Sequence, residues 1–269
     1  MVFYSLLVLA GLIGGFLAGF TGVGTGFIMI VVIPFALKQM GFPDEEIVRF
    51  TIANTIFATM CSSLVNNIGL IIKRNFYIKE TLLISVASAI SSSVMLLMIV
   101  MQPGYTTAKY NVIIIVLLAY IIFRTINKLR KSSPIKERIT NFKLVTSGLG
   151  GGIVAALTGL GGGSIIIPIL NLWMRIDIKK AKSIAYGSIF ITALFITFLN
   201  IINEPKIPVD YPHLGYLLLP VALPLSIGVI IASPLGLKFG EKISSRYISY
   251  IFLSIISIVM IRKIFELFP

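Results

Sequence analysis

Charged side chains are scarce in this chain. Only 12% of its 269 residues are Asp, Glu, Lys or Arg, about half of the roughly 25% that is usual in a soluble domain. At the same time 57% of the residues are hydrophobic, and the mean hydropathy is +1.00. Several uncharged stretches of roughly 20 residues are long enough to cross a bilayer. The composition therefore excludes an ordinary soluble domain and indicates a multi-pass α-helical membrane protein.

Cysteine and histidine are almost missing, and acidic residues are few. Cys61 is the one cysteine, so the sequence offers neither an internal disulfide nor a cysteine-based metal cluster. All ten acidic residues fall in predicted loops or at the ends of predicted spans. No buried carboxylate pair is therefore expected for metal or acid–base chemistry. The sequence predicts no enzyme, no metal, no cofactor and no proton-carrying side chain in the membrane interior.

The net charge of +13 has its origin in loops rather than in a nucleic-acid-binding surface. Basic residues in short loops between apolar segments mark the cytoplasmic side of a membrane protein. The strongest such segment is 124–143, where only Glu137 opposes Arg124, Lys128, Arg130, Lys131, Lys136, Arg138 and Lys143. We expect this connector to lie in the cytoplasm, the protein to span the cytoplasmic membrane, and nucleic acid not to be a partner.

Glycine clusters interrupt two of the apolar segments. Residues 21–27 read Thr-Gly-Val-Gly-Thr-Gly-Phe, and residues 158–164 read Thr-Gly-Leu-Gly-Gly-Gly-Ser. Three glycines in six residues should break a helix. Inside a bilayer, non-helical backbone occurs only where protein buries it or where it lines a polar cavity. Two broken helices at membrane depth therefore indicate a transport site.

The two clusters belong to a longer internal repeat. An offset of 137 residues places Gly11, Gly15 and Gly19 on Gly148, Gly152 and Ala156. Small residues four apart form a helix face on which a second backbone can approach closely. Similarity extended over a whole half of the chain indicates a structural duplication.

The repeat predicts the architecture. Residues 1–123 form the first membrane repeat, 124–143 the basic connector and 144–269 the second repeat. Three spans follow each glycine cluster, at 50–72, 81–101 and 106–123, then at 183–202, 213–237 and 247–261. Loop charges place the acidic residues 44–46 outside and the basic residues 175–182 inside. Each glycine segment should thus be a re-entrant hairpin that returns to its own side, and the two all-α halves should have inverted orientation.

The hairpin tips are the predicted substrate site. Helix N-termini carry free N–H groups and bind anions, and glycine lets a ligand approach the backbone. Hydroxyl groups in and after the turns can add donors. The predicted substrate-binding residues of the tips are Thr21, Gly22, Gly24, Thr25, Gly26, Thr158, Gly159, Gly161, Gly162, Gly163 and Ser164.

The spans after the hairpins supply further polar residues. Asn54 and Thr55 are predicted to line the site, as are Gly187 and Ser188 at the matching positions of the second half. Ordinary hydrogen bonding of such side chains to helix carbonyls is the competing interpretation. Arg49 and Lys182 lie at matched span ends and are predicted to be entrance charges that attract anions. The alternative is that they only reach the membrane interface.

These residues resemble those of a known family, the TauE/SafE sulfite exporters, also called toluene-sulfonate uptake permeases. The resemblance rests on 151–163 with Pro168, on the duplicated pattern at 14–26 with Pro34, and on Ala-Ser-Pro-Leu-Gly at 232–236. It covers nearly the whole chain. It implies two halves, about eight membrane elements and the movement of sulfur-containing anions such as sulfite, thiosulfate and organosulfonates.

The sequence as a whole predicts a secondary transporter that moves a small oxyanion across the bilayer by alternating access. An anion channel is one alternative, and a transporter of another small solute coupled to Na⁺ is a second, since unwound backbone also exposes carbonyl groups. The particular anion, the direction of transport, H⁺ or Na⁺ as coupling ion, and a homo-oligomeric state are all left open.

Overall fold

The computed structural model describes residues 2–130 and 139–267, so the central part of the connector, 131–138, lies outside the described residues. The described chain is helical apart from one short antiparallel hairpin. Its elements in chain order are α1 (Val2–Thr21), α2 (Gly26–Gln39), α3 (Asp44–Ile72), α4 (Ile78–Met95), α5 (Thr107–Arg130), α6 (Asn141–Thr158), α7 (Gly163–Pro168), α8 (Ile178–Ile202), β1 (His213–Leu214), β2 (Leu217–Leu218), α9 (Leu219–Gly240) and α10 (Ser245–Leu267). The π-helical segments Leu96–Val100 and Ile169–Trp173 continue α4 and α7 without a break.

Seven described helices are long and apolar enough to cross a membrane. Six of them are the spans that the sequence predicts, namely α3, α4 with its π-helical extension, α5, α8, α9 and α10; the seventh is α1. An all-helical, multi-pass membrane protein is therefore confirmed.

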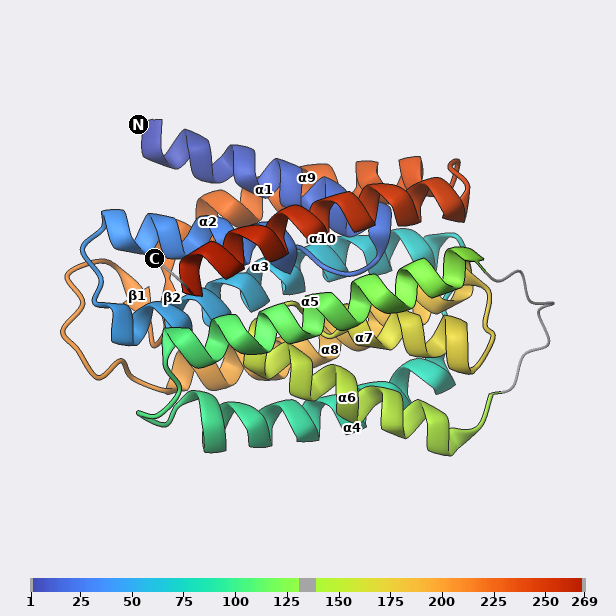
Figure 1. Ribbon diagram of the computed structural model, residues 1–269, viewed down its shortest axis with the longest axis horizontal. Helices are drawn as coiled ribbons and strands as arrows, with labels where there is room; N and C mark the ends of the chain where they lie inside the picture. The colour runs from blue at the N-terminus through green and yellow to red at the C-terminus, as the bar shows by residue number, and fades with distance from the viewer. Residues whose placement is uncertain (1, 131–138, 268–269) are drawn as a thin grey trace.

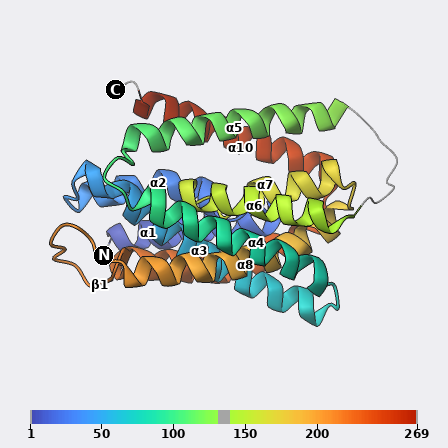
Figure 2. The ribbon, with the colours of Figure 1, turned by 90° about the horizontal axis from the view of Figure 1, so that it is seen from below.

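The helices lie roughly along one long axis, with α3 and α8 in the middle (Figures 1 and 2). The pair α1 and α9 packs on one edge, the pair α4 and α6 packs on the opposite edge, and α5 and α10 form a layer in front. The side chains of α8 are the most occluded, those of α3 are half buried, and those of α10 mostly face outward. The centre of the molecule is therefore built from α3 and α8, with the two glycine turns packed against them.

Each glycine cluster ends one helix and starts a second that runs back. The first pair, α1 and α2, begins and ends at the left of Figure 1, where Leu7 and Leu37 share one apolar cluster. The second pair, α6 and α7, begins and ends at the right, where the Lys143 amine lies 5.3 Å from the centre of the Trp173 ring. The chain thus turns back at both clusters, from opposite ends of the molecule.

Small residues on α1 and α6 face neighbouring backbones, as predicted. A Cβ atom added to Gly11, Gly15 or Gly19 would fall within 2.7 Å of the α9 backbone. A Cβ atom added to Gly148 or Gly152 would likewise lie within 2.4 Å of the α4 backbone, at Ile84 and Ser88 respectively. Glycine is required in these stripes because the backbones touch.

Several predicted boundaries differ from those in the structure; α8 begins five residues before the predicted span, α10 ends six residues after it, and three further differences are larger or change the type of element. The acidic residues 44–46, expected in a loop, form the first turn of α3 after Pro43, where carboxylates interact favourably with the helix dipole. Residues 213–218, expected to start a span, form the β1–β2 hairpin instead, with Gly215 at a φ of +53°. The third span continues to Arg130, into the segment that was assigned to the connector.

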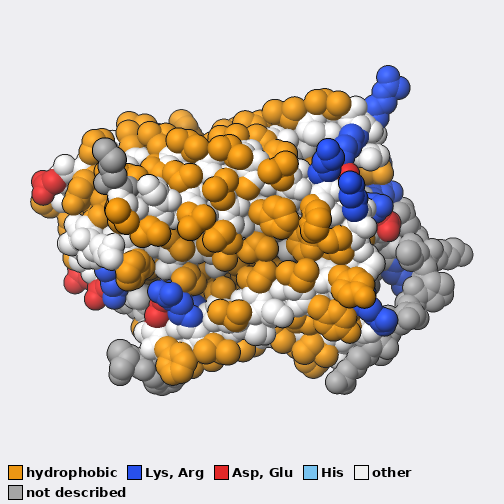
Figure 3. Space-filling model, turned by 90° about the horizontal axis from the view of Figure 1, so that it is seen from above, with side chains coloured by type: hydrophobic (Ala, Val, Ile, Leu, Met, Phe, Trp, Pro, Cys, Tyr) orange, Lys and Arg blue, Asp and Glu red, His pale blue; other side chains and the backbone are white. Residues whose placement is uncertain are grey.

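Charged residues gather at the two ends of the molecule and leave an apolar belt between them (Figure 3). Lys and Arg are concentrated at the end where the connector lies, and acidic residues mark the other end. Large apolar side chains such as Val86, Ile90 and Phe198 are exposed along the belt. This distribution fits a protein whose sides face lipid.

Candidate functional site

The two glycine turns have the same local structure. The Thr21 hydroxyl donates to the Leu17 carbonyl at 2.8 Å and accepts from the Val23 N–H at 3.3 Å. The Thr158 hydroxyl makes the equivalent bonds, donating to the Val154 carbonyl and accepting from the Leu160 N–H. Each threonine therefore ends its helix and starts the turn, and the two sets of bonds are related by the repeat offset.

Glycine is needed in both turns for its backbone conformation. Gly22 and Gly24 have φ values of +87° and +102°, while Gly159 and Gly161 have +75° and +78°. Side chains with a Cβ atom rarely adopt such values. Gly162 adds a third positive φ to the second turn, of +69°, where the first turn has Thr25 at −76°. The turns are alike in their first half and differ in their second.

The two turns touch each other. A Cβ atom on Gly26 would lie 2.6 Å from the Cα of Leu160. A Cβ atom on Gly163 would lie 3.1 Å from the carbonyl oxygens of Gly22 and Val23. The first residue of each returning helix therefore packs against the opposite turn, and glycine at both positions allows this close approach.

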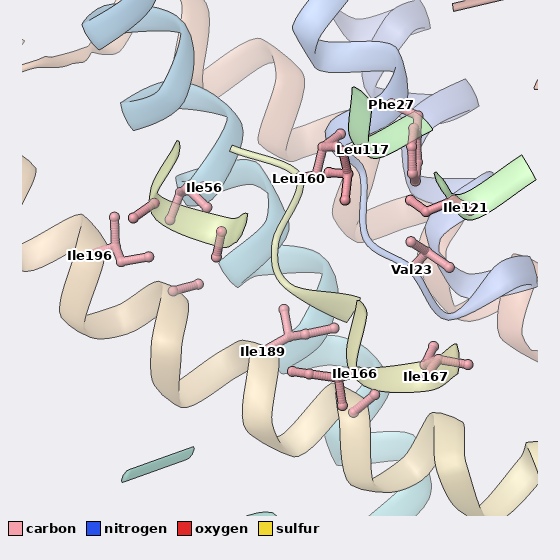
Figure 4. Close-up of a cluster of buried hydrophobic side chains, with 14 of the residues drawn as sticks. Val23, Phe27, Ile56, Leu117, Ile121, Leu160, Ile166, Ile167, Ile189 and Ile196 are labelled. Carbon is pink, nitrogen blue, oxygen red and sulfur yellow. The ribbon is translucent and has the colours of Figure 1, made fainter. Parts of the chain in front are cut away.

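One apolar residue in each turn anchors it in the core. Val23 and Leu160 occupy equivalent repeat positions and are almost fully buried. Figure 4 shows Val23 near Phe27 and Ile121, and Leu160 near Leu117, in one cluster of buried side chains. Their close packing in this cluster holds both turns in the interior of the molecule.

The carbonyl groups at the ends of α1 and α6 are already satisfied. The Lys182 amine donates to the Phe20 carbonyl at 2.7 Å, and the Tyr186 hydroxyl donates to those of Ala18 and Gly19.

In the second pair, the Tyr105 and Tyr110 hydroxyls donate to the carbonyls of Leu157 and Thr158. Burial raises the pKa of Tyr105, in the loop before α5, well above its ordinary value, so its phenol keeps the proton that it donates. The first turn thus has a cation against it where the second has neutral phenols.

The N–H groups of the turns are not satisfied in this way. Among the described residues no acceptor is found for seven backbone N–H groups, those of Gly24, Thr25, Gly26, Phe27, Gly161, Gly162 and Ser164. All seven residues are buried. A buried donor without an acceptor costs about 1–3 kcal/mol, so these groups require an acceptor from outside the chain. The paired turns are therefore a concentration of unfilled hydrogen-bond donors.

Threonine hydroxyls of α3 complete the surroundings of the turns. The hydroxyl oxygens of Thr25 and Thr59 are 2.8 Å apart, and the Thr59 methyl group lies against both Gly24 and Gly161. Thr55 packs on Gly159, and its buried hydroxyl has no partner in the described chain. Thr59 thus contacts both turns. In the sequence, only its position four residues after Thr55, on the same face of the helix, indicates that it lies near the site.

Other predicted site residues are engaged elsewhere. The Asn54 amide donates to the carbonyls of Phe50 and Tyr216 and accepts from the Leu218 N–H, which fixes the β1–β2 hairpin on α3. Gly187 packs against Thr81 of α4, and the Ser188 hydroxyl donates to carbonyls of α8 and α4. These three residues hold helices together and do not meet the turns.

Arg49 is also occupied by protein groups, at the end of the molecule away from the connector. Its guanidinium donates to the Glu46 carboxylate at 2.8 Å and to the carbonyls of Val100 and Gln102. The exposed fraction of Arg49 is only 3%, so the side chain that was predicted to be an entrance charge closes the end of α4. Glu46 is equally buried, although it lies in the first turn of α3, at the end of a span as the sequence predicts.

Lys182 lies at the inner edge of a large cavity at the connector end. This cavity, which we call the vestibule, has a volume of about 680 Å³. It is lined by Leu70, Lys73, Asn75, Tyr77, Asp177, Lys179, Lys180, Lys182, Ser183, Tyr186, Leu237, Gly240 and Glu241. Four lysines against two acidic residues give it a positive character, and Lys182 and Tyr186 connect it to the end of α1. An anion that enters here would be drawn toward the first turn.

Comparisons with known proteins identify the family. The family described as Sulfite exporter TauE/SafE matches residues 7–263, almost the whole chain. The chain belongs to this family. The TauE/SafE resemblance seen in the glycine clusters is thereby confirmed, and the protein is a membrane transporter of that family.

Two curated relatives extend along the full length. A probable membrane transporter protein of Methanocaldococcus jannaschii is 26% identical over 261 residues, which cover 96% of this chain and 94% of the relative. A probable membrane transporter protein of Haemophilus influenzae is 26% identical over 269 residues, with 97% and 99% coverage. Both relatives therefore have the size of this TauE/SafE chain.

Proposed function

We propose that this TauE/SafE protein is a secondary transporter that carries a small oxyanion, such as sulfite, thiosulfate or an organosulfonate, by alternating access between two inverted repeats. Its substrate binds at the paired turns. The hydrogen-bond donors that lack an acceptor there are the observation that carries the proposal.

The contacts between helices support the repeat. The repeat matches α1 to α5 with α6 to α10 in order. Under this match the packed pair α1 and α9 corresponds to the packed pair α6 and α4, and the pairs α3 with α8 and α5 with α10 each correspond to themselves. The same exchange relates the Thr21 bonds to the Thr158 bonds. Both helix pairs turn back to the end from which they start, which supports two re-entrant hairpins of opposite orientation.

Charge supports the orientation in a cytoplasmic membrane. The end with the connector carries Lys73, Lys79, Lys179, Lys180, Lys238 and Lys242, among other basic residues, and few acidic ones. By the positive-inside rule this end, together with the vestibule, faces the cytoplasm. The opposite end is packed by the Arg49–Glu46 pair and by the β1–β2 hairpin. With this orientation, the vestibule opens toward the cytoplasm, and we infer a state that is open inward.

The turns favour an anion over a cation. The carbonyl oxygens of Gly22 and Val23 lie close to Gly163, and the carbonyl oxygen of Gly159 lies close to Gly26. The carbonyls that end α1 and α6 are bonded to Lys182 and to tyrosines. Seven N–H donors of the turns lack an acceptor among the described residues, and the Lys182 side chain lies against Gly22, so the site attracts negative charge.

Exchange in liposomes tests transport against a channel. Purified protein is reconstituted with or without unlabelled thiosulfate inside, and entry of ³⁵S-thiosulfate is followed, with sulfite and methanesulfonate as competitors. Trans-stimulated entry that one of these anions competes for is the expected result. Anion conductance without trans-stimulation would identify a channel, and flux of none of the three anions, with Na⁺ present or absent, would contradict the proposed substrate class.

A further inference from the structure

A second, smaller cavity lies beside the first turn and is distinct from the vestibule. This side cavity has a volume of about 80 Å³, and it is enclosed by the first turn, the end of α5, α7 with its π-helical extension, and the starts of α8 and α10. Since a water molecule occupies about 30 Å³ in the liquid, the side cavity can hold a small tetrahedral anion. Lys182 is the one residue that lines both cavities.

Two donors that line the side cavity have no partner in the described chain. The Ser164 hydroxyl belongs to a residue that is 1% exposed, and it makes no hydrogen bond. The Nε of Arg124 is also buried without an acceptor, while the guanidinium carbon lies 5.9 Å from the centre of the Tyr120 ring. Among the described residues that line this cavity, none is acidic. A half-buried guanidinium and an unpaired hydroxyl are costly unless an acceptor, best a charged one, meets them.

The remaining walls of the side cavity are apolar. Ile167, Ile178, Ile248 and Phe252 line the side cavity together with the polar residues Thr21, Asn171 and Lys182. A ligand that matches these walls has a negatively charged oxygen group at one end and an apolar part at the other. Both small organic oxyanions and phospholipid headgroups have this chemistry.

We propose that the side cavity is a second oxyanion-binding site, in which Arg124 and Ser164 bind the oxygen atoms of a ligand with an apolar substituent. The proposal goes beyond the transport site, because neither Arg124 nor α10 contributes to the paired turns. The occupant would link the layer of α5 and α10 to the first turn.

Trp173 offers a built-in reporter, because it is the only tryptophan and lies two residues after Asn171. Delipidated protein in neutral detergent is titrated with butanesulfonate, and protein in nanodiscs is compared between phosphatidylglycerol and phosphatidylcholine. Tryptophan emission and the thermal midpoint are read in both. If emission and midpoint change saturably with butanesulfonate in detergent, the ligand of the side cavity is a small soluble anion. If they change only in phosphatidylglycerol nanodiscs, the ligand is a lipid headgroup.

Three variants decide whether the response comes from this site. Arg124→Gln should weaken the apparent affinity at least tenfold, and Ser164→Ala should weaken it several-fold. Arg246→Gln, which removes an exposed arginine at the start of α10, should leave it unchanged. Gly161→Val, in the second turn, whose glycines do not line the side cavity, should abolish transport and keep the tryptophan response, which separates the two sites.

The proposal is overturned if Arg124→Gln binds as the wild type does while both have the same ligand-free midpoint. It is equally overturned if neither butanesulfonate nor phosphatidylglycerol gives a saturable response. Loss of transport in Arg124→Gln with unchanged binding would also count against it, because Arg124 would then act elsewhere.

Discussion

At the scale of single residues, both turns depend on glycines in backbone conformations that other residues rarely adopt. Their positive φ values could be anticipated, because clusters of glycine in an apolar helix have few other uses. The bonds that cap the ends of α1 and α6 could not be predicted, since Lys182, Tyr186, Tyr105 and Tyr110 come from elements far away in the sequence. Thr21 and Thr158 were placed correctly in the turns, but their hydroxyls serve the turn backbone and are not free for a ligand.

Valine in either turn should abolish anion binding. Gly24→Val and Gly161→Val force a β-branched residue into φ values of +102° and +78°, and the new side chain at 161 would also meet Thr59. Isothermal titration with thiosulfate measures the loss. Gly69→Ala is the control, because nothing lies within 4 Å of its added Cβ atom. Wild-type affinity in either valine variant would place the site elsewhere.

The charge of Lys182 should matter for affinity. Lys182→Met is expected to weaken thiosulfate binding by about tenfold or more, because a charge-assisted hydrogen bond is worth about 1.5–3 kcal/mol. Lys182→Arg should restore most of it by keeping a donor near the Phe20 carbonyl. If Met and Arg at this position weaken binding equally, the side chain acts by its shape and not by its charge.

At the scale of elements, the glycine stripes show what a sequence can and cannot reveal. The spacing of Gly11, Gly15 and Gly19 predicts a face for close packing, and the structure confirms it. The partner helix was not predictable, because α9 presents its own small residues from the other half of the chain. The same limit explains Asn54, whose partners in the β1–β2 hairpin lie more than 160 residues away.

Alanine should therefore have opposite effects at two helical glycines. Gly19→Ala places a Cβ atom 1.9 Å from the Ser233 carbonyl oxygen, and overpacking of this kind costs about 1–3 kcal/mol. Gly150→Ala meets only the Ile165 side chain at 3.5 Å and should be neutral or stabilising by up to about 1 kcal/mol. Thermal midpoints in detergent compare the two, and equal midpoints would contradict close packing of α1 on α9.

At the scale of the whole molecule, the repeat predicts which loops share a side of the membrane. With Cys61 replaced, single cysteines at Asp44 and Gly104 should react with an impermeant maleimide from outside intact cells. Cysteines at Asn141 and Asp177 should react only after permeabilisation, because those positions lie at the basic end. Labelling of positions 44 and 177 from the same face would rule out inverted hairpins.

The exchange of helix pairs between halves also explains why the fold was only partly predictable. Each half supplies one glycine-broken pair that packs on a span of the other half, so neither half holds a complete site. Sequence patterns describe each half, whereas the contact between the two turns depends on how the halves pack together.

The central claim is that the amides of the paired turns bind a small oxyanion, and selective stabilisation tests it most directly. The thermal midpoint of the Arg124→Gln variant, whose side cavity should be inactive, is measured with sulfite, thiosulfate, methanesulfonate or chloride at equal ionic strength, as Na⁺ and as K⁺ salts. At least one oxyanion should raise the midpoint saturably, by the equivalent of about 2.7 kcal/mol at 100 times its dissociation constant, with either cation. A midpoint that no oxyanion raises above its value in chloride, or that follows Na⁺ alone, would contradict the account.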